Sequence, residues 1–478
     1  MTKYVKTIWL EIHMRIKSKT KMFCGCKNAV ELASEPNTNT CSVCMWFPGM
    51  LPTLNEEVVR LGLIWGIAMW CEVNKISRFD RKTYFYPDNP TAYQITQLYD
   101  PIVWAGSVKT IVNGEERDFA IHHMHLENDA GKLIHAWWKT LCDYNRAGSP
   151  LMEIVTDPVF HDREEVMEFL RELQKIMRAA GVSDADMEKW QMRCDVNISM
   201  AAEGSTELWN RTETKNVNSF SAIWRVIDHE SARQIKILES GWVVDQETRG
   251  WDDDKWVSTT QRSKEDAMDY RYFPEPDLLP IELTDSFVQE AREQIPELPI
   301  EKRIRYLHEY KLAEDDARIL TTTRDLSEYF DILVKQTKDP KKSCSYITTI
   351  LLALINESED IQKISDLKFD IEELVKVINL VNADELSSTN SKQVVEELFN
   401  NGWDADIIID ENNLRQKNDL WALESIVDEV IKSNEKQVED YKWWNTNIFG
   451  FFVWQCMKAS KWQWNPKIFN EILKKKLG

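Results

Sequence analysis

The sequence predicts an α+β fold, in which a strand-rich domain is followed by an all-helical domain and then by a small helical tail domain. Up to about residue 290, short runs alternate between apolar and polar residues, with turn-forming segments such as PDNP and PEPD between them. From about residue 295, apolar residues instead recur every three or four positions, as along amphipathic helices. A prior of roughly 150 residues per domain also suggests about three domains. We expect their bounds at 1–294, 295–405 and 406–478.

Composition and charge limit the functions open to this chain. Hydrophobic residues make up 43% and charged residues 29% of the 478 positions, as is usual for folded soluble proteins. No run approaches 18 apolar residues, and the first 20 residues alternate instead of forming a signal peptide, so we expect a cytoplasmic protein without membrane contact. The net charge of −20 opposes non-specific nucleic-acid binding, so any such surface must be local.

The first predicted strand lies in the segment TIWLEIHMRI. Side chains alternate between the two faces of a strand, so one face is wholly apolar, with Ile8, Leu10, Ile12, Met14 and Ile16. Glu11 and His13 then point together from the opposite face.

Three further segments repeat this arrangement. Asp195 and Asn197 share a face in MRCDVNISM, Glu213 and Lys215 share one in RTETKN, and His125 and Glu127 share one in HMHLENDAGK if it is extended. Carboxylate, imidazole, amide and ammonium groups together suit Mg²⁺ and phosphate chemistry. They equally suit the solvated face of a half-exposed antiparallel sheet.

Four of the nine cysteines are close together in the sequence. Cys24 and Cys26 form a CxC pair and Cys41 and Cys44 form a CxxC pair, on either side of the turn-prone EPNTNT. Four soft ligands at this spacing suit a tetrahedral, structural Zn²⁺ with no position open for water. The alternative is four unliganded thiols in a reducing compartment.

Residues 458–478 form a locally basic segment. Its last helix should begin with Asn465 as N-cap and Pro466 at the first helical position. Glu471 is its one acidic residue, and its lysines are Lys458, Lys461, Lys467, Lys474, Lys475 and Lys476. Such a cluster is either a nucleic-acid contact or a solubilising helix end.

Many ordered motifs resemble the GatB family of tRNA-dependent amidotransferase subunits. They include KMFCGC, DRKTYFYPDNP, HLENDAGK, DYNRAGSPLMEIVTDP, MRCDVNIS, RTETKNVNSF and DYRYFPEPDL. The resemblance implies a cradle-like kinase domain of a ligase that uses ATP to phosphorylate the side-chain carboxylate of Glu-tRNA(Gln) or Asp-tRNA(Asn). Ammonia from an amidase-family glutaminase partner then displaces the phosphate, and a small, belt-like third partner completes the heterotrimer.

The resemblance also implies roles for individual residues. Metal and phosphate would be bound first by Glu11, His13, His125 and Glu127, and second by Asp195, Asn197, Glu213 and Lys215. Within these sets, Mg²⁺ is expected at Glu11, His13 and Glu127, and ATP contacts at the same three residues and Asn128. The tail lysines Lys458, Lys461, Lys467, Lys474 and Lys475 would contact tRNA.

The sequence departs from the family motifs at two positions, and two alternatives to this interpretation remain open. Asn128 stands where the family usually has a second glutamate, and His123 stands where arginine is usual. A non-catalytic tRNA-binding or assembly protein of the same fold is one alternative. The archaeal, glutamate-specific E-type relative is the other, although its large inserted domain has no counterpart between DYRYFPEPDL and the helical region.

Tryptophan is unusually frequent, with 20 residues beside only 15 glycines. Glycine at its usual frequency would give about 33 residues. Seven tryptophans stand where the family motifs have glycine: Trp9, Trp46, Trp190, Trp209, Trp242, Trp454 and Trp462. We expect that UGA codons meaning glycine were translated as tryptophan, the alternative being genuine enrichment. Trp251 matches a tryptophan of the family.

Overall fold

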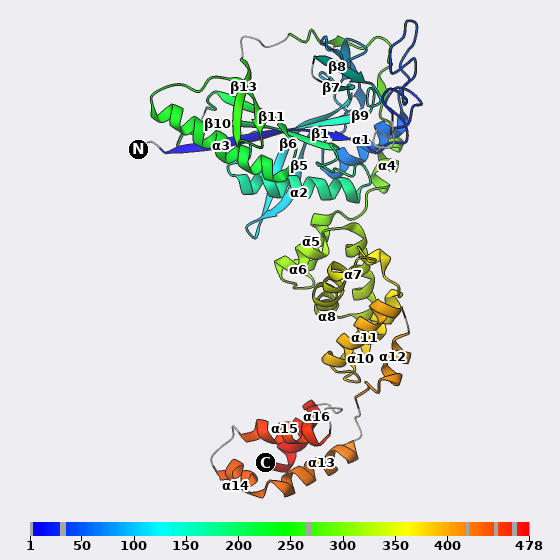
Figure 1. Cartoon of the computed structure of the whole chain (residues 1–478), viewed down its shortest axis with the longest axis vertical. Helices are drawn as coiled ribbons and strands as arrows, with labels where there is room; N and C mark the ends of the chain where they lie inside the picture. Colours follow the sequence, from blue (N-terminus) through cyan, green and yellow to red (C-terminus); the bar gives the residue numbers. More distant parts are fainter. Residues whose placement is uncertain are drawn as a thin grey trace. The chain divides into compact units, whose positions relative to one another are not determined.

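The computed structural model describes residues 3–28, 35–136, 138–205, 207–263, 269–402, 404–416, 420–443, 448–460 and 466–477. The chain divides into two compact units, a sheet unit at 1–302 and a helical unit at 303–478. The first is built around one large sheet and the second consists of helices (Figure 1). The expected fold class is therefore confirmed.

An eight-stranded sheet forms the centre of the sheet unit. All neighbouring strands are antiparallel except the parallel pair β11 and β12. In spatial order the strands are β13 (Val257–Ser263), β12 (Glu247–Asp252), β11 (Arg211–Val217), β10 (Met192–Ala202), β1 (Tyr4–Arg15), β9 (Pro150–Thr156), β6 (Glu115–Asn128) and β5 (Val103–Val112). The four segments predicted from alternation are thus strands β1, β6, β10 and β11, and all belong to one sheet.

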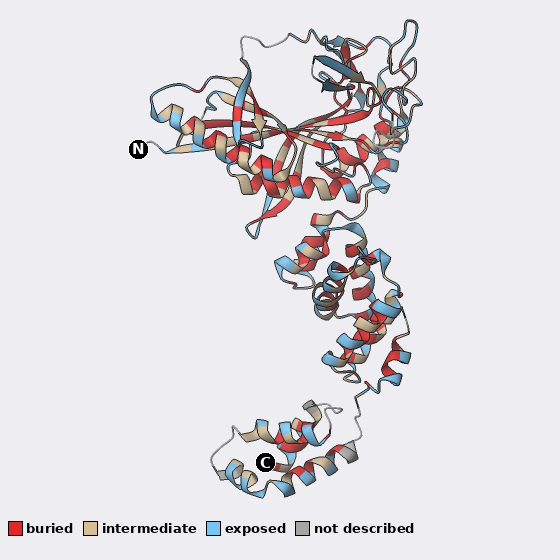
Figure 2. Cartoon of the chain, in the orientation of Figure 1, coloured by how far each residue is buried: buried red, intermediate tan, exposed pale blue. Residues whose placement is uncertain are grey.

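One face of this sheet is apolar and packed. The predicted apolar residues of β1 are fully buried, and so are their neighbours Met192, Cys194, Val196 and Ile198 on β10. Figure 1 shows α2 (Arg163–Ala179) and α3 (Phe220–Glu239) along the sheet, and α3 contributes Ile223, Val226 and Ile227 to the core. Figure 2 shows how buried residues concentrate along the strands. The polar side chains of β1 and β10 therefore project from the opposite face.

Smaller elements surround the large sheet. They are α1 (Glu56–Ala68), α4 (Asp285–Glu293), the three-stranded sheet of β14 (Phe273–Pro274), β3 (Asp80–Thr83) and β4 (Tyr93–Thr96), the pair β15 (Ile281–Glu282) and β2 (Ile76–Ser77), and the hairpin β7 (Lys132–Ala136) and β8 (Lys139–Asp143). Asn128, at the end of β6, links β6 to the small sheet because its Oδ1 accepts a hydrogen bond from the Ile95 N–H at 2.8 Å. The small sheet therefore lies beside the polar end of β6.

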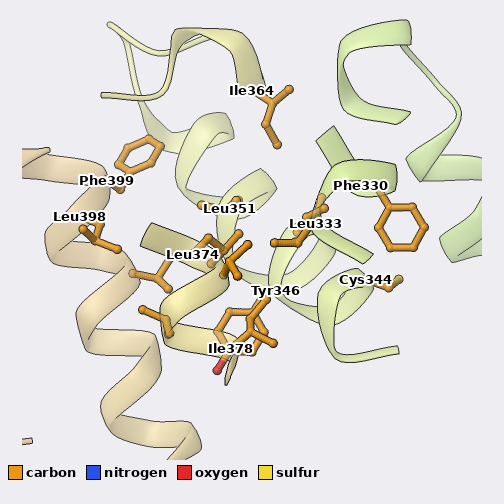
Figure 3. Close-up of a cluster of buried hydrophobic side chains, with 14 of the residues drawn as sticks. Phe330, Leu333, Cys344, Tyr346, Leu351, Ile364, Leu374, Ile378, Leu398 and Phe399 are labelled. Carbon is orange, nitrogen blue, oxygen red and sulfur yellow. The ribbon is translucent and has the colours of Figure 1, made fainter. Parts of the chain in front are cut away.

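The helical unit has two apolar core clusters. The helices are α5 (Pro299–His308, which spans the unit boundary), α6 (Glu314–Leu320), α7 (Arg324–Thr337), α8 (Pro340–Ser345), the π-helix η3 (Tyr346–Leu351), α9 (Leu352–Glu357), the 3₁₀-helix η4 (Ile364–Asp366), α10 (Ile371–Asn382), α11 (Ser388–Asn401), α12 (Ala405–Glu411), α13 (Leu420–Ser433), α14 (Glu435–Trp443), α15 (Phe449–Ala459) and α16 (Pro466–Leu477). One cluster packs residues of α5 to α12, and Figure 3 shows Phe330, Leu351 and Leu374 within it. The other packs residues of α13 to α16.

The last helix begins at Pro466, as the sequence predicts, while Asn465 lies outside the described residues. Phe469, Ile472 and Leu473 form its buried side. None of the helices in the described ranges is long and apolar enough to cross a membrane.

Candidate functional site

Polar side chains of five strands meet on the open face of the large sheet. Glu11 on β1 lies opposite Asp195 on β10, and His13 lies opposite Glu153 on β9. Glu153 in turn lies opposite His125 on β6. Residues directly opposite each other in antiparallel strands project from the same face, so the strand register brings these groups together.

Two histidines and two glutamates form the first group, the histidine–glutamate cluster of His13, His125, Glu127 and Glu153. The Nε2 atom of His13 lies 3.2 Å from a Glu153 oxygen and 3.8 Å from a Glu127 oxygen. The Nε2 atom of His125 lies 3.6 Å from Glu153 and 3.8 Å from Glu127. Glu127 is 2% exposed, so these charges interact with little screening by water.

The electrostatics of this cluster favour charged carboxylates paired with cations. Burial alone would raise the pKa values of Glu127 and Glu153, but His125 and His13 outweigh it and lower both. Burial likewise lowers the pKa of His13, but Glu153 and Glu127 outweigh that effect and raise it to about 9. Lys82 has a raised pKa because Glu127 and Glu153 outweigh its desolvation. Near neutral pH, two anions therefore face two cations, His13 and Lys82.

The second group is the acidic cluster of Glu11, Asp195 and Glu213. One carboxylate oxygen from each lies within 4.8 Å of the others. The ammonium of Lys215 lies 2.9 Å from both Asp195 and Glu213. Three carboxylates thus share one ammonium group, which leaves an excess of negative charge.

Neighbouring groups orient this cluster. The Thr248 hydroxyl donates to Glu213 at 2.8 Å, and the fully buried Asn197 amide donates to Glu11 at 3.4 Å. Desolvation, followed by the charges of Glu153 and Glu213, raises the pKa of Glu11. Three hard oxygen donors with excess negative charge are a chemically suitable set for Mg²⁺.

The structure brings the eight candidate residues onto one face but divides them differently from expectation. The expected Mg²⁺ set of Glu11, His13 and Glu127 is not one group, because Glu11 belongs to the acidic cluster and the other two to the histidine–glutamate cluster. Asn128 belongs to neither, since its Oδ1 is occupied by the Ile95 N–H. The register of β1 causes the division, because the acidic residue opposite Glu11 is Asp195 on β10, whereas the acidic residue opposite His13 is Glu153 on β9.

Two residues of the site were missed in the sequence. Glu153 is the one charged residue in the apolar strand PLMEIVT, and this isolation was the available signal. Lys82 belongs to the small sheet and reaches the cluster only through tertiary packing. Its side-chain nitrogen lies 5.0 Å from the ring centre of Tyr270.

His123 extends the histidine–glutamate cluster along β6. Its ring stacks on His125 with centroids 5.4 Å apart, and Trp104 lies 6.0 Å away. Burial and the neighbouring His125 and His122 lower the pKa of His123 to about 4, so this imidazole is neutral at physiological pH. It therefore cannot supply the positive charge of the arginine usual in the family.

The four clustered cysteines come together from two turns. Their sulfur atoms all lie within 4.8 Å of one another. The Cys41 N–H donates to Cys44 Sγ at 3.1 Å, and the Lys21 ammonium lies 3.8 Å from that sulfur. A hydrogen bond from Cys24 lowers the pKa of Cys44 to about 5. Four convergent sulfurs with N–H···S support fit a Zn²⁺ ion bound at about 2.3 Å from each sulfur.

The tail lysines are only partly described. Lys458 on α15 and Lys474 and Lys475 on α16 are exposed, and Lys458 lies 5.2 Å from the Trp454 ring centre. Lys461 and the side chain of Lys467 lie outside the described residues. Lys476 pairs with Asp428 at 2.6 Å.

Comparison with known proteins now identifies the family. Residues 6–289 match the family model described as "GatB/GatE catalytic domain", and residues 328–477 match the one described as "GatB domain". The chain belongs to the GatB family. Its members are the GatB subunits of the aspartyl/glutamyl-tRNA(Asn/Gln) amidotransferases, which are ligase complexes.

Relatives of this family match the chain over its whole length. The GatB subunit of this amidotransferase from Caldicellulosiruptor bescii is 43% identical over 477 residues, which is 99% of each chain. The protein of the same name from Lachnoclostridium phytofermentans is 42% identical over 480 residues and all of both chains. That from Persephonella marina is 41% identical over 98% of each chain. The resemblance to the GatB family stated from the motifs is therefore confirmed, and both clusters lie within the match to the catalytic domain.

Proposed function

We propose that the chain transfers the γ-phosphoryl group of ATP to the side-chain carboxylate of the amino acid on Glu-tRNA(Gln), Asp-tRNA(Asn) or both. One observation carries this proposal: two adjacent groups of acidic, cationic and imidazole side chains, buried or half-buried, on the open face of one sheet. A packed sheet keeps so many charges together only at a cost, and such groups concentrate at functional sites.

Mg²⁺ fits the acidic cluster better than the histidine–glutamate cluster. Glu11, Asp195 and Glu213 keep an excess of negative charge after pairing with Lys215. Glu127 and Glu153 are already balanced by His13 and Lys82. When bound, the ion would neutralise phosphate oxygens of ATP.

The remaining groups position and balance the reactants. Phosphoryl transfer depends on positioning and charge neutralisation more than on covalent help from the protein. The ammonium group of Lys215, which pairs with Asp195 and Glu213, can also donate a hydrogen bond to a phosphate oxygen. His13 and Lys82 carry N–H donors beside the acidic cluster, and an anionic carboxylate could share these donors with Glu127 and Glu153. Glu153 and His125 hold His13 and Glu127 in place.

The acyl phosphate formed in this way is the electrophile that ammonia attacks, with release of phosphate. We propose an amidase-family glutaminase partner as the source of ammonia, a small third partner that completes a heterotrimer, and a cytoplasmic location. The names of the relatives, which call each of them one subunit of an Asp/Glu-tRNA(Asn/Gln) amidotransferase, support a multisubunit partner set.

We further propose three domains at 1–294, 295–405 and 406–478, with a structural Zn²⁺ at the four cysteines and tRNA contacts at the tail lysines. Two separate apolar clusters support a division of the helical unit into two parts, with the first cluster extending past residue 405 to Leu414 and the second beginning at Leu423. The convergence of four sulfurs supports the zinc site.

The reconstituted heterotrimer tests the kinase assignment. We expect Glu11→Gln and Glu213→Gln to reduce tRNA-dependent ATP consumption by a factor of roughly 10²–10³, as removal of charge-stabilising groups does in other enzymes. Glutamine hydrolysis should persist. Glu188→Gln, at an exposed turn of the same unit, makes the same chemical change and should leave both activities unchanged. Wild-type ATP consumption by both cluster variants would instead favour a non-catalytic assembly role.

A further inference from the structure

Four tryptophans occupy left-handed backbone conformations. Trp46, Trp70, Trp190 and Trp256 have φ angles of 53°, 52°, 57° and 57°. Among the described non-glycine residues with positive φ, these tryptophans are as numerous as asparagine and aspartate together. Left-handed φ is uncommon outside glycine, asparagine and aspartate, and for a bulky residue it is an outlier.

Each of these residues ends or turns a segment. Trp70 directly follows Met69, the C-cap of α1, at the position where glycine is strongly preferred. Trp190 closes a turn by donating its N–H to Met187 O at 3.1 Å, and Trp46 does the same to Val43 O at 2.9 Å. Trp256 ends the connection between β12 and β13. These backbone positions require the freedom that glycine has.

Packing does not explain why tryptophan stands at three of these turns, while Trp46 is half-buried against Tyr93. Trp70, Trp190 and Trp256 are 50%, 55% and 63% exposed. Strained residues normally persist because surrounding contacts hold them in place. Here half or more of the indole surface meets solvent, so the strain is not offset by burial.

The connection of the hairpin formed by β7 and β8 also contains tryptophan in the sequence. Ala136 on β7 pairs with Lys139 on β8, so the dipeptide Trp137–Trp138 connects the two strands in the sequence. Two-residue hairpin connections strongly favour glycine and asparagine. Trp138 is 82% exposed, while Trp137 lies outside the described residues.

Trp251 differs from the tryptophans at the turns in its backbone conformation and in the contacts of its indole ring. It lies within β12, its indole N–H donates to Asp253 at 2.8 Å, and its ring meets the edge of His229 with centroids 5.6 Å apart. Its backbone has no positive φ. At position 251 the indole ring therefore makes specific contacts, and the family motif also has tryptophan at this position.

We propose that the protein made by its source organism carries glycine at positions 46, 70, 190 and 256, and also at position 9, because UGA codons there encode glycine. Positions 70 and 256 are identified by the backbone alone, independently of the family motifs. Trp46 and Trp190 were indicated by the motifs and are now also indicated by their φ angles.

Position 9 links this proposal to the functional site. Trp9 lies opposite Asn197 on the open face of the sheet, two residues before Glu11. The Arg211 guanidinium lies 5.3 Å from its ring centre and, among the described residues, has no carboxylate within ion-pair distance. Glycine at this position removes the ring and leaves Arg211 accessible to a phosphate or carboxylate group beside the acidic cluster. This consequence rests on the proposed function.

The decisive experiment reads the gene and the peptides of the protein from its natural source. We expect UGA codons and glycine at positions 46, 70, 190 and 256, and a UGG codon with tryptophan at 251. Tryptophan in the natural protein at any of the four positions would overturn the assignment.

A recombinant comparison tests the same point without the source organism. In the assembled complex, Trp70→Gly, Trp190→Gly and Trp256→Gly should each raise the melting temperature or leave it unchanged, whereas Trp251→Gly should lower it. A similar loss in all four variants would contradict the proposal. Trp9→Gly should increase formation of phosphorylated aminoacyl-tRNA several-fold relative to the matched variant Trp70→Gly. No increase would remove the role of Arg211 but not the codon assignment, which the peptides decide.

Discussion

The sheet unit and the helical unit use buried side chains in different ways. The two core clusters of the helical unit consist of apolar side chains such as Leu374 and Phe452. Most of its charged groups pair on the surface, as Arg415 does with Asp406 at 3.1 Å, where both side chains are nearly half exposed, and the buried Arg303 pairs with Glu314 at 3.0 Å. In the sheet unit, Glu127 and His125 are buried beside other charges. Buried apolar groups stabilise a fold, whereas a concentration of buried charges opposes stability and indicates chemistry.

The largest effect should come from removing one charge of the histidine–glutamate cluster. Glu153→Gln deprives His13 and Lys82 of an anionic partner while preserving the shape of the side chain. We expect a loss of roughly 10²–10³ in formation of phosphorylated aminoacyl-tRNA. Rates measured with the assembled complex, beside Glu188→Gln, check this. Unchanged turnover would show that buried charge does not mark the reactive region.

Loss of the proposed zinc ion should affect the sheet unit alone. Cys41→Ser removes one of the four sulfur ligands, so the segment around the cysteines should lose its fixed conformation. Metal analysis should give about one zinc per chain for the wild type, a value set by the four-ligand geometry. It should give none for the variant, and the melting temperature should fall. Cys142→Ser, outside the cluster, is the control. A zinc-free wild type with four freely titratable thiols would contradict the site.

A cavity in the helical core should reduce stability without reducing activity, in contrast to Glu153→Gln. Leu374→Ala removes a fully buried side chain from the cluster drawn in Figure 3. The expected cost is about 2–5 kcal/mol in the free energy of unfolding, with no change in the rate of phosphorylation at temperatures where the complex is folded. Denaturant unfolding and turnover measured on the same sample test both parts. A large loss of turnover without loss of stability would break the contrast between the units.

The raised pKa of His13 predicts a dependence of stability on pH. Its pKa is about 9 in the folded chain against 6.5 for an ordinary histidine. A raised pKa means that the folded state binds the proton more tightly, so this stabilisation is complete below pH 6.5. It is lost as the pH rises through 9. The loss should be on the order of 3 kcal/mol, since one pKa unit corresponds to about 1.4 kcal/mol. Metal-free protein unfolded at several pH values tests this, and Glu153→Gln should flatten the curve; an identical slope in that variant would contradict the cause.

The smallest effect is expected at the tail. Replacing both Lys474 and Lys475 by alanine should weaken tRNA binding and reduce the salt slope of affinity by about 2, because each phosphate contact contributes about 1. Binding titrations at several salt concentrations measure this. Lys436→Ala, an exposed lysine on α14, serves as the control. An unchanged slope would leave the lysines as solubilising groups.

Local periodicity predicted much of the fold and part of the site. The alternation around Glu11, Asp195 and Glu213 predicted their strands and faces because the period of a strand is local. The separation of Glu11 from His13 into two clusters could not be predicted, since it depends on pairing between strands far apart in the sequence, as the match of His13 with Glu153 shows. Lys82 was missed for the same reason. The long helices α2 and α3 were not delimited, because the short alternating runs on either side of them dominate the pattern of that region.

The position of β1 has a consequence for the synthesis of the chain. Of the strands in the described residues it is the earliest in the chain, yet its neighbours in the sheet are β9 and β10, which begin at Pro150 and Met192. During translation, both edges of β1 therefore remain unpaired until β9 and then β10 have been synthesised. Until then the apolar residues Ile8, Leu10 and Ile12 remain exposed. Unpaired strand edges with exposed apolar surface favour aggregation in partly folded chains. The nascent polypeptide should consequently depend on chaperones until β10 emerges, and fragments that end before residue 192 should be insoluble.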